Sequence, residues 1–239
     1  MKVKSTYLPT FMYKRRMPSL DSSLILDTLG NNSLGICAPT SAANILLYLS
    51  KAKAQLVSSS FDDTKHTIGS NLVEILTSDM HTTKAGTNIE PFIDGLEKYV
   101  KDRRYKIKIC WIGYFYQGKR KLKDETDLEL IMKKTIGTSN SILWLGEYKY
   151  NKKDKTYTRV TGHAVTIAGF NTGLNGFLVH DPAESYSTPR TLLLKRIEGI
   201  PIKDISADGP YKIASSRSST ESDKIINILE GAASFEIYR

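Results

Sequence analysis

The first half of the chain carries its apolar residues mainly at intervals of three or four positions. Such stretches lie at 37–51, 70–80 and 88–102. This interval matches one turn of an α-helix, so each stretch predicts a helix with one buried face. A further helix is predicted over 124–136. Before it, residues 105–116 include alternating apolar and basic side chains, which is typical of a half-buried strand.

Beyond residue 140 the pattern changes to extended apolar runs. We expect strands at 141–150, 156–170, 176–181 and 191–197, with a polar hairpin turn at 151–155 between the first two. A short helix is expected at 222–229 and a last extended segment at 234–238. Helices followed by strands predict an α+β fold, in which a helical N-terminal half packs on an antiparallel β-sheet of the C-terminal half. We expect a single domain over 1–239.

Composition narrows the possible classes of protein. Hydrophobic residues make up 40% and charged residues 25% of the chain, which are ordinary globular values and exclude a mainly disordered protein. The longest apolar runs fall far short of the roughly 20 residues that a membrane-spanning helix needs. The basic N-terminus lacks a continuous apolar segment of about 7 to 15 residues, so we expect no secretory signal, and export stays open.

The surplus of positive charge is local. The chain has 34 Lys plus Arg against 25 Asp plus Glu, a formal net charge of +9. Within 101–123, nine basic residues accompany a single acidic one, Asp102. Such a cluster fits a nucleic-acid surface, because Lys and Arg neutralise phosphates. The cluster fits the solvent-exposed face of a strand better, because lysines and isoleucines alternate. We therefore expect no nucleic-acid partner, only long-range attraction to anionic surfaces.

The position of one cysteine suggests a chemical role. Only two cysteines, Cys37 and Cys110, occur, which excludes a disulfide framework and a cysteine zinc site. Cys37 begins the first predicted helix, just before Pro39, and the partial positive charge of a helix N-terminus stabilises a thiolate. A small buried cysteine with no chemical role fits the position equally well. A nucleophilic thiol also needs a base.

Four histidines are candidates for that base. His66 and His81 lie in polar surroundings that suggest surface residues. His163 begins a strongly apolar predicted strand directly after a glycine, and a core histidine bonded to backbone is the alternative there. Asp181 ends the next predicted strand, where a carboxylate would reach an imidazole N–H. His180 adjoins Asp181, and either side chain is able to face the site.

Three short segments form a pattern in chain order. They are CAPTSAAN at 37–44, TGHAVTIAGF at 161–170 and VHDPA at 179–183. They resemble the nucleophile motif, the histidine strand and the third catalytic segment of the papain-like cysteine peptidases of the C39-like group, as found in bacteria. The resemblance covers about 28–185. The cysteine and the histidine are 163 − 37 = 126 positions apart, an interval close to that of papain-like folds.

The resemblance implies a papain-like fold and hydrolysis of peptide bonds in a peptide or protein substrate. Cys37 would attack the scissile carbonyl, His163 would act as general base and then acid, and Asp181 would orient the imidazole. The backbone N–H of Cys37 and the side chain of Asn31 would bind the oxyanion. No cofactor is implied, and four scattered histidines without an HExxH motif predict no metal site.

Two departures from the family pattern bear on activity. Ala38 stands where the nucleophile motif has glycine, and its methyl group is expected to narrow the site. Asn31 stands where a glutamine is common, one methylene shorter, with Asn32 beside it as an alternative amide donor. These departures leave two interpretations, a slow cysteine peptidase and an inactive C39-like domain that binds peptides or cell-wall fragments.

Overall fold

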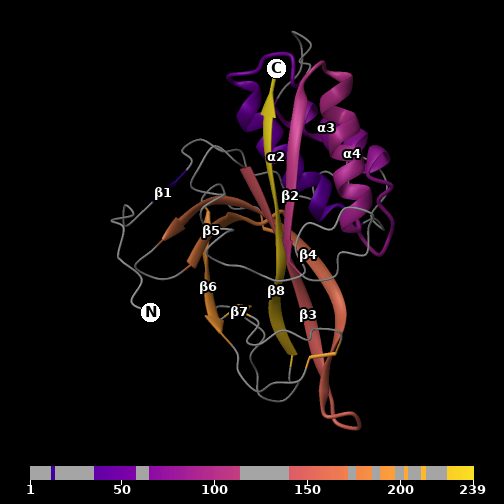
Figure 1. The fold of residues 1–239 in the computed structure, drawn as a ribbon, viewed down its shortest axis with the longest axis vertical. Helices are drawn as coiled ribbons and strands as arrows, with labels where there is room; N and C mark the ends of the chain where they lie inside the picture. Colours follow the sequence, from indigo (N-terminus) through magenta and orange to yellow (C-terminus); the bar gives the residue numbers. More distant parts are fainter. Residues whose placement is uncertain are drawn as a thin grey trace.

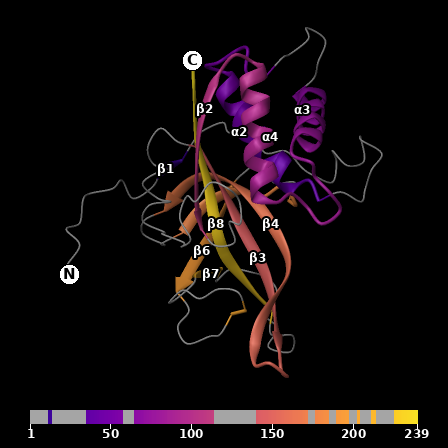
Figure 2. The same cartoon turned by 45° about the vertical axis from the view of Figure 1, so that its right-hand side comes forward.

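The computed structural model describes residues 12–13, 35–57, 65–113, 140–171, 176–184, 189–196, 202–203, 211–213 and 225–239. In these residues the protein is α+β, as predicted. Helices α2 (Cys37–Ser50), α3 (Lys65–Asp79) and α4 (Ile89–Asp102) gather at one end of a long antiparallel sheet, as Figure 1 shows. The turned view of Figure 2 shows the same helices beside the upper half of the sheet.

The strands of the described sheet form a closed ring with two additions. They are β1 (Met12–Tyr13), β2 (Lys106–Gly113), β3 (Asn140–Asn151), β4 (Thr156–Asn171), β5 (Gly176–His180), β6 (Arg190–Arg196), β7 (Tyr211–Ile213) and β8 (Ile225–Tyr238). Six of them pair in the order β4-β3-β8-β7-β6-β5, and β5 pairs again with β4. β2 adds to the C-terminal half of β8, and β1 adds to the end of β4. Closure pairs the edges that an open sheet would expose.

Most of the predicted elements are confirmed. α2, α4 and the strands from β3 to β6 begin and end within about two residues of their predicted bounds. α3 begins at Lys65, earlier than predicted. On β2 the predicted alternation holds, because Lys106 and Lys108 are exposed while Ile107 packs against the core of the helices. The helix predicted over 124–136 lies outside the described residues.

The helix predicted over 222–229 is wrong for the residues that the structure describes. Residues 225–229 form the first part of β8, which continues through the expected extended segment 234–238. β8 pairs with β3 along one edge and with β2 and β7 along the other, and residues 228–235 are buried. At 225–229 the apolar residues Ile225, Ile228 and Leu229 have the spacing of a helix face and not the period of two of a strand, so the local pattern predicted a helix.

Two hydrophobic cores share the strands. One lies between the sheet and the helices, where Trp144 meets Phe92 and Trp111 edge to face with ring centroids 4.8 Å and 5.5 Å apart. The other is formed by residues of the strand ring itself. β4 serves both cores, because Ala164 belongs to the first and its neighbour Val165 to the second. β4 is therefore held firmly from both sides.

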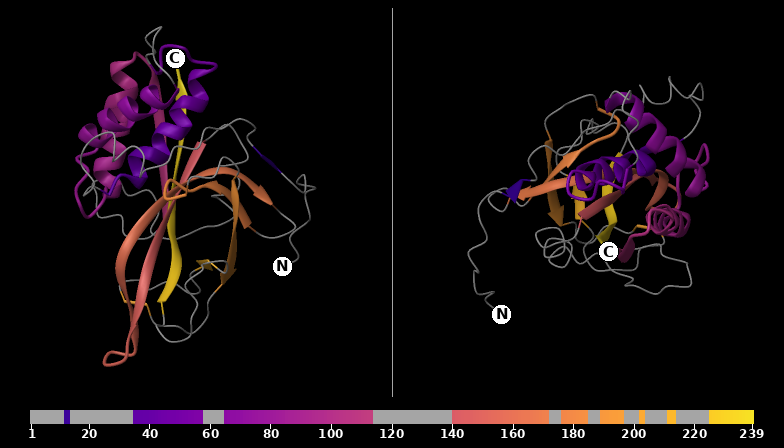
Figure 3. Two further views of the ribbon diagram at one scale, coloured as in Figure 1. Left: turned by 180° about the vertical axis from the view of Figure 1, so that it is seen from behind. Right: turned by 90° about the horizontal axis from the view of Figure 1, so that it is seen from above.

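Buried hydrogen bonds fix α2 against β4. Ser41 Oγ donates to the carbonyl of Ala164 (3.1 Å), and Thr166 Oγ1 donates to the carbonyl of Ser41 (3.1 Å). Asn44 Nδ2 donates to Thr166 Oγ1 (3.4 Å). The helix cannot slide along the strand without breaking these directional bonds. Cys37 is thus held one turn before Ser41, and Figure 3 shows α2 lying against the strands.

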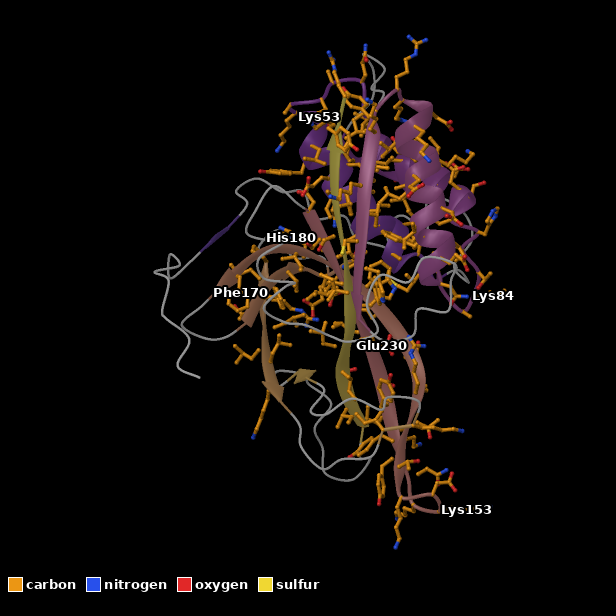
Figure 4. All side chains as sticks on the ribbon, viewed as in Figure 1. Lys53, Lys84, Lys153, Phe170, His180 and Glu230 are labelled. Carbon is orange, nitrogen blue, oxygen red and sulfur yellow. The ribbon has the colours of Figure 1, made fainter. Side chains whose placement is uncertain are left out.

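A buried carboxylate, Glu230 on β8, is held by side chains from β3 and β4 and is labelled in Figure 4. It accepts hydrogen bonds from Tyr148 Oη (2.9 Å) and from Nε and Nη2 of Arg159, the latter at 3.0 Å. Two paired glycines leave the space for this network. A Cβ added at Gly146 would lie 2.0 Å from Glu230 Oε1. A Cβ added at Gly162 would lie 2.2 Å from Arg159 Nη2.

We expect Gly146→Ala to destabilise the fold by about 1–3 kcal/mol, because the new methyl group must displace a buried, paired carboxylate. The free energy of unfolding in urea measures this change. Thr161→Ala, at an exposed position of β4, is the control and should change that free energy by less than about 0.5 kcal/mol. Equal stability of the two variants would contradict the role given to Gly146.

Candidate active site

Cys37 is the first residue of α2 and lies at the end of the helix that carries partial positive charge. In this first turn, which the structure describes fully, there is no acidic residue and no side-chain cap. No negative group of that turn therefore competes with a thiolate. The side chain is partly exposed, so a substrate is able to reach it. Such a position lowers the pKa of a thiol.

The backbone before Cys37 is held by the loop between α3 and α4. The N–H of Gly35 donates to the carbonyl of Thr83 (3.0 Å). A Cβ at Gly35 would lie 2.8 Å from the Cα of Gly86, whose φ is +99°. The close approach requires a glycine at 35, and the left-handed backbone favours one at 86. The contact between these two glycines was not predicted, because nothing in their local sequence indicates it.

His163 lies on β4, opposite Leu145 of β3. Its Nε2 is 2.6 Å from Oδ1 of Asp181, and a carboxylate accepts, so Nε2 donates. The side chains of His163 and Cys37 lie close enough for each to shift the pKa of the other, and Nδ1 is the ring nitrogen that Asp181 does not engage. The ring therefore contacts two side chains and is 31% exposed, unlike the alternative of a core histidine bonded only to backbone.

Asp181 follows β5 directly, and its side chain is only 4% exposed. The pairing of β5 with β4 brings the end of β5 beside His163. Oδ1 also accepts the backbone N–H of Ala183 (2.9 Å), and Oδ2 accepts from Nη2 of Arg190. Both oxygens of the carboxylate are therefore engaged, and the group is held in one orientation.

Arg190 is a member of this cluster that the sequence did not predict. It begins β6, where the register places it opposite Val179, two positions before Asp181. Its Nη1 donates to Oε1 of Glu184 (2.8 Å), so the guanidinium bridges two carboxylates. In the sequence it is one of 34 basic residues, and no spacing connects it with Asp181. Only the pairing of β5 with β6 brings the two together.

Burial and hydrogen bonding act in opposite directions on the three side chains. Burial raises the pKa of the Cys37 thiol, but the hydrogen bond and charge of His163 lower this pKa overall. Burial lowers the pKa of His163, but hydrogen bonds to Asp181 and Cys37 raise it overall. Burial raises the pKa of Asp181, but the hydrogen bond and charge of His163 lower it overall. The arrangement therefore favours a thiolate, an imidazolium and a carboxylate side by side.

The remaining histidines and the second cysteine have other surroundings. His180, labelled in Figure 4, is buried, and neither of its ring nitrogens has a hydrogen-bond partner in the part of the chain that the structure describes. Burial lowers the pKa of this ring. His81 is exposed, as expected, and the side chain of His66 lies outside the described residues. Cys110 is partly exposed on β2, with its Sγ 3.9 Å from the carbonyl oxygen of Trp111.

The residues expected around the oxyanion are described only in part. Asn31 and Asn32 lie outside the described residues. Ala38 is 1% exposed and packs in the core of the helices. Its methyl group therefore packs in the core. This position does not support the expectation that Ala38 narrows the site.

Two properties concern the described residues as a whole. No group of three or more His, Cys, Asp or Glu side chains among them is arranged to hold a metal ion. None of their helices is both long and apolar enough to cross a membrane.

Comparison with known proteins identifies the family of the chain. Comparison with curated proteins gives no sequence match. A family model described as the Peptidase_C39 like family matches residues 23–196. The matched range is well over half of the 239 residues and includes Cys37, His163 and Asp181. The chain therefore belongs to the Peptidase_C39 like family.

Proposed function

We propose that this chain is a cysteine peptidase that hydrolyses peptide bonds in peptide or protein substrates. One observation carries the proposal: the His163 ring is hydrogen-bonded to the Asp181 carboxylate and lies close enough to the Cys37 thiol for each to shift the pKa of the other. A thiol, a base and an orienting carboxylate in contact form the arrangement that nucleophilic catalysis by cysteine needs. Membership of a peptidase family supports the same chemistry.

The proposed reaction has two stages. The Cys37 thiolate attacks the carbonyl carbon of the scissile bond, and the imidazolium of His163 gives its proton to the departing amine, which leaves a thioester. Water then attacks the thioester while His163 takes a proton from it, and the acid product departs as the thiolate re-forms. Asp181 stays ionised, orients the ring through Nε2 and stabilises the imidazolium.

Two donors are proposed for the oxyanion that forms during attack. The N–H of Cys37 belongs to the first turn of α2, where N–H groups have no carbonyl partner within the helix. The side-chain amide of Asn31 is the proposed second donor. Loss of one such donor raises the barrier by about 2.7–4 kcal/mol, so poor placement of Asn31 would make the enzyme slow.

A papain-like arrangement and a single domain over 1–239 are part of the proposal. The nucleophile lies on a helix, the histidine and the carboxylate lie on an antiparallel sheet, and α2 packs on β4. This division of the site supports the resemblance drawn from the sequence. One hydrophobic core contains residues of all three described helices and of β2, β3, β4 and β8, which supports one folding unit.

The alternative is an inactive C39-like domain that binds a peptide or a cell-wall fragment at the same place. Asn31, in place of the glutamine common in the family, favours it. The two functions differ in the chemistry of Cys37, because a peptidase needs a reactive thiolate and a binding domain does not.

If the chain is a peptidase, Cys37 should react with iodoacetamide much faster than Cys110 near neutral pH, since the thiolate is the nucleophile. Mass spectrometry of the labelled, folded chain measures both rates in the same molecule. Equal and slow labelling of the two cysteines would favour the binding domain.

Replacement of the nucleophile should abolish hydrolysis. We expect Cys37→Ala to cleave fluorescently quenched casein at least about 1000-fold more slowly than the wild type, because no thioester forms without the sulfur. Cys110→Ala removes the other thiol and should retain the wild-type rate. Undiminished cleavage by Cys37→Ala would refute the mechanism.

Asp181→Asn should narrow the pH range of activity. Asp181 raises the pKa of His163, and the imidazolium lowers the pKa of Cys37, so thiolate and imidazolium coexist over a wide range. Without the negative charge the pKa of His163 falls and that of Cys37 rises, which moves the alkaline limb down and the acid limb up. The pH profile of kcat/KM for casein peptides measures both limbs. A profile as wide as that of the wild type would contradict the role of Asp181.

A further inference from the structure

The turn after β5 and the start of β6 are tied together at two points. Asp181 begins this turn, and the N–H of Glu184 donates to the carbonyl of Asp181 (3.0 Å). Arg190 reaches across from β6 with one Nη on each carboxylate, on Oδ2 of Asp181 and on Oε1 of Glu184. A planar guanidinium is able to make two such bonds at a fixed angle, whereas an ammonium group is a point charge.

The contact with Arg190 restricts how the carboxylate of Asp181 turns. Oδ1 already accepts from His163 Nε2 and from the N–H of Ala183. With Oδ2 bound to Arg190, rotation of the carboxylate would break bonds on both oxygens. Asp181 is buried while Arg190 is 40% exposed, so the pair needs little further desolvation of the guanidinium.

We propose that Arg190 is a positioning residue for the Cys37–His163 pair, acting by holding the Asp181 carboxylate with Oδ1 directed at the imidazole. The inference rests on the proposed function, because it assigns Arg190 a part in that same site. Arg190 touches neither the thiol nor the imidazole in the described contacts, so its effect passes through Asp181.

Among the described residues, charged or titratable groups face Asp181 from three elements and from its own turn. His163 faces it from β4 with Cys37 behind, Arg190 faces it from β6, and Glu184 lies in its own turn. His180 precedes it on β5 and is buried, and its ring has no hydrogen-bond partner among the described residues.

Two possible effects of Arg190 have opposite signs at His163. If Arg190 acts only as a positive charge, its removal stabilises the imidazolium and raises the pKa of His163. If Arg190 holds the carboxylate in place, its removal weakens the bond from His163 to Asp181 and lowers the pKa of His163. Both effects raise the pKa of Cys37. The direction of the change at His163 therefore separates orientation from simple charge.

The experiment measures both groups in the full chain without any substrate. The pH dependence of iodoacetamide alkylation reports the pKa of Cys37, and NMR of the histidine rings reports the pKa of His163. In Arg190→Gln we expect the pKa of His163 to fall and that of Cys37 to rise. Arg190→Lys keeps the positive charge but lacks the planar guanidinium with its two donor groups. In this variant we expect the pKa of His163 to fall and that of Cys37 to rise by smaller amounts. An unchanged or raised pKa of His163 in Arg190→Gln would overturn the proposal.

Lys195→Gln is the matched control, because it removes one positive charge from an exposed position of the same strand. It should leave both pKa values as in the wild type. Thermal unfolding of each variant tests whether it folds. If Arg190→Gln does not fold, Arg190→Lys carries the test, and wild-type pKa values in that variant would overturn the proposal.

Hydrolysis gives a second readout. We expect Arg190→Gln to lower kcat/KM by about 10- to 100-fold, mainly through kcat, because the proposal assigns Arg190 to holding Asp181 and not to binding substrate. Failure of this inference is distinguishable from failure of the proposed function. Wild-type cleavage by Cys37→Ala would remove the function itself. Loss of cleavage in Cys37→Ala with an unshifted His163 in Arg190→Gln would remove only the role of Arg190.

Discussion

The site depends on one set of buried hydrogen bonds between α2 and β4. Ser41 donates to the carbonyl of Ala164, and its own carbonyl accepts from Thr166. Each such bond adds only about 0.5–1.5 kcal/mol of net stability, but a buried group left unpaired costs about 1–3 kcal/mol. A slip of one helical turn would move Cys37 about 5.4 Å along the strand, out of hydrogen-bond reach of His163. These bonds therefore fix the register between nucleophile and base.

The charged side chains of the candidate site alternate in sign along the series of contacts from Cys37 to Glu184. In the ionised state that the pKa shifts favour, a thiolate on α2 would be followed by an imidazolium on β4, the Asp181 carboxylate after β5, the Arg190 guanidinium on β6 and the Glu184 carboxylate. Burial alone would drive the inner groups to their neutral forms. Each charge is stabilised by an oppositely charged neighbour, so the ionisation of each group depends on the ionisation of the others.

The alternation on β2 was predicted correctly, and the first part of β8 was not. On β2 the lysines and isoleucines alternate because one face meets water and the other meets the helices. The basic surplus that first suggested nucleic acid therefore has a structural explanation at Lys106 and Lys108. In the first part of β8, Ile225, Ile228 and Leu229 follow the spacing of a helix and not a period of two, so this stretch was taken for a helix although β8 pairs along both edges.

Local patterns in the sequence were sufficient to select the three residues of the candidate site. They indicate Cys37 at a helix start, His163 where β4 becomes continuously apolar and Asp181 directly after the end of β5. The family also followed, since the predicted range 28–185 lies within the matched range 23–196.

The neighbours of these three residues become visible only in the folded chain. It directs Asp181 rather than His180 at the imidazole, adds Arg190 from β6, and brings Gly35 against Gly86. These contacts depend on strand register and on the packing of loops. Register and packing are set by residues far apart in the chain, so no local pattern encodes them.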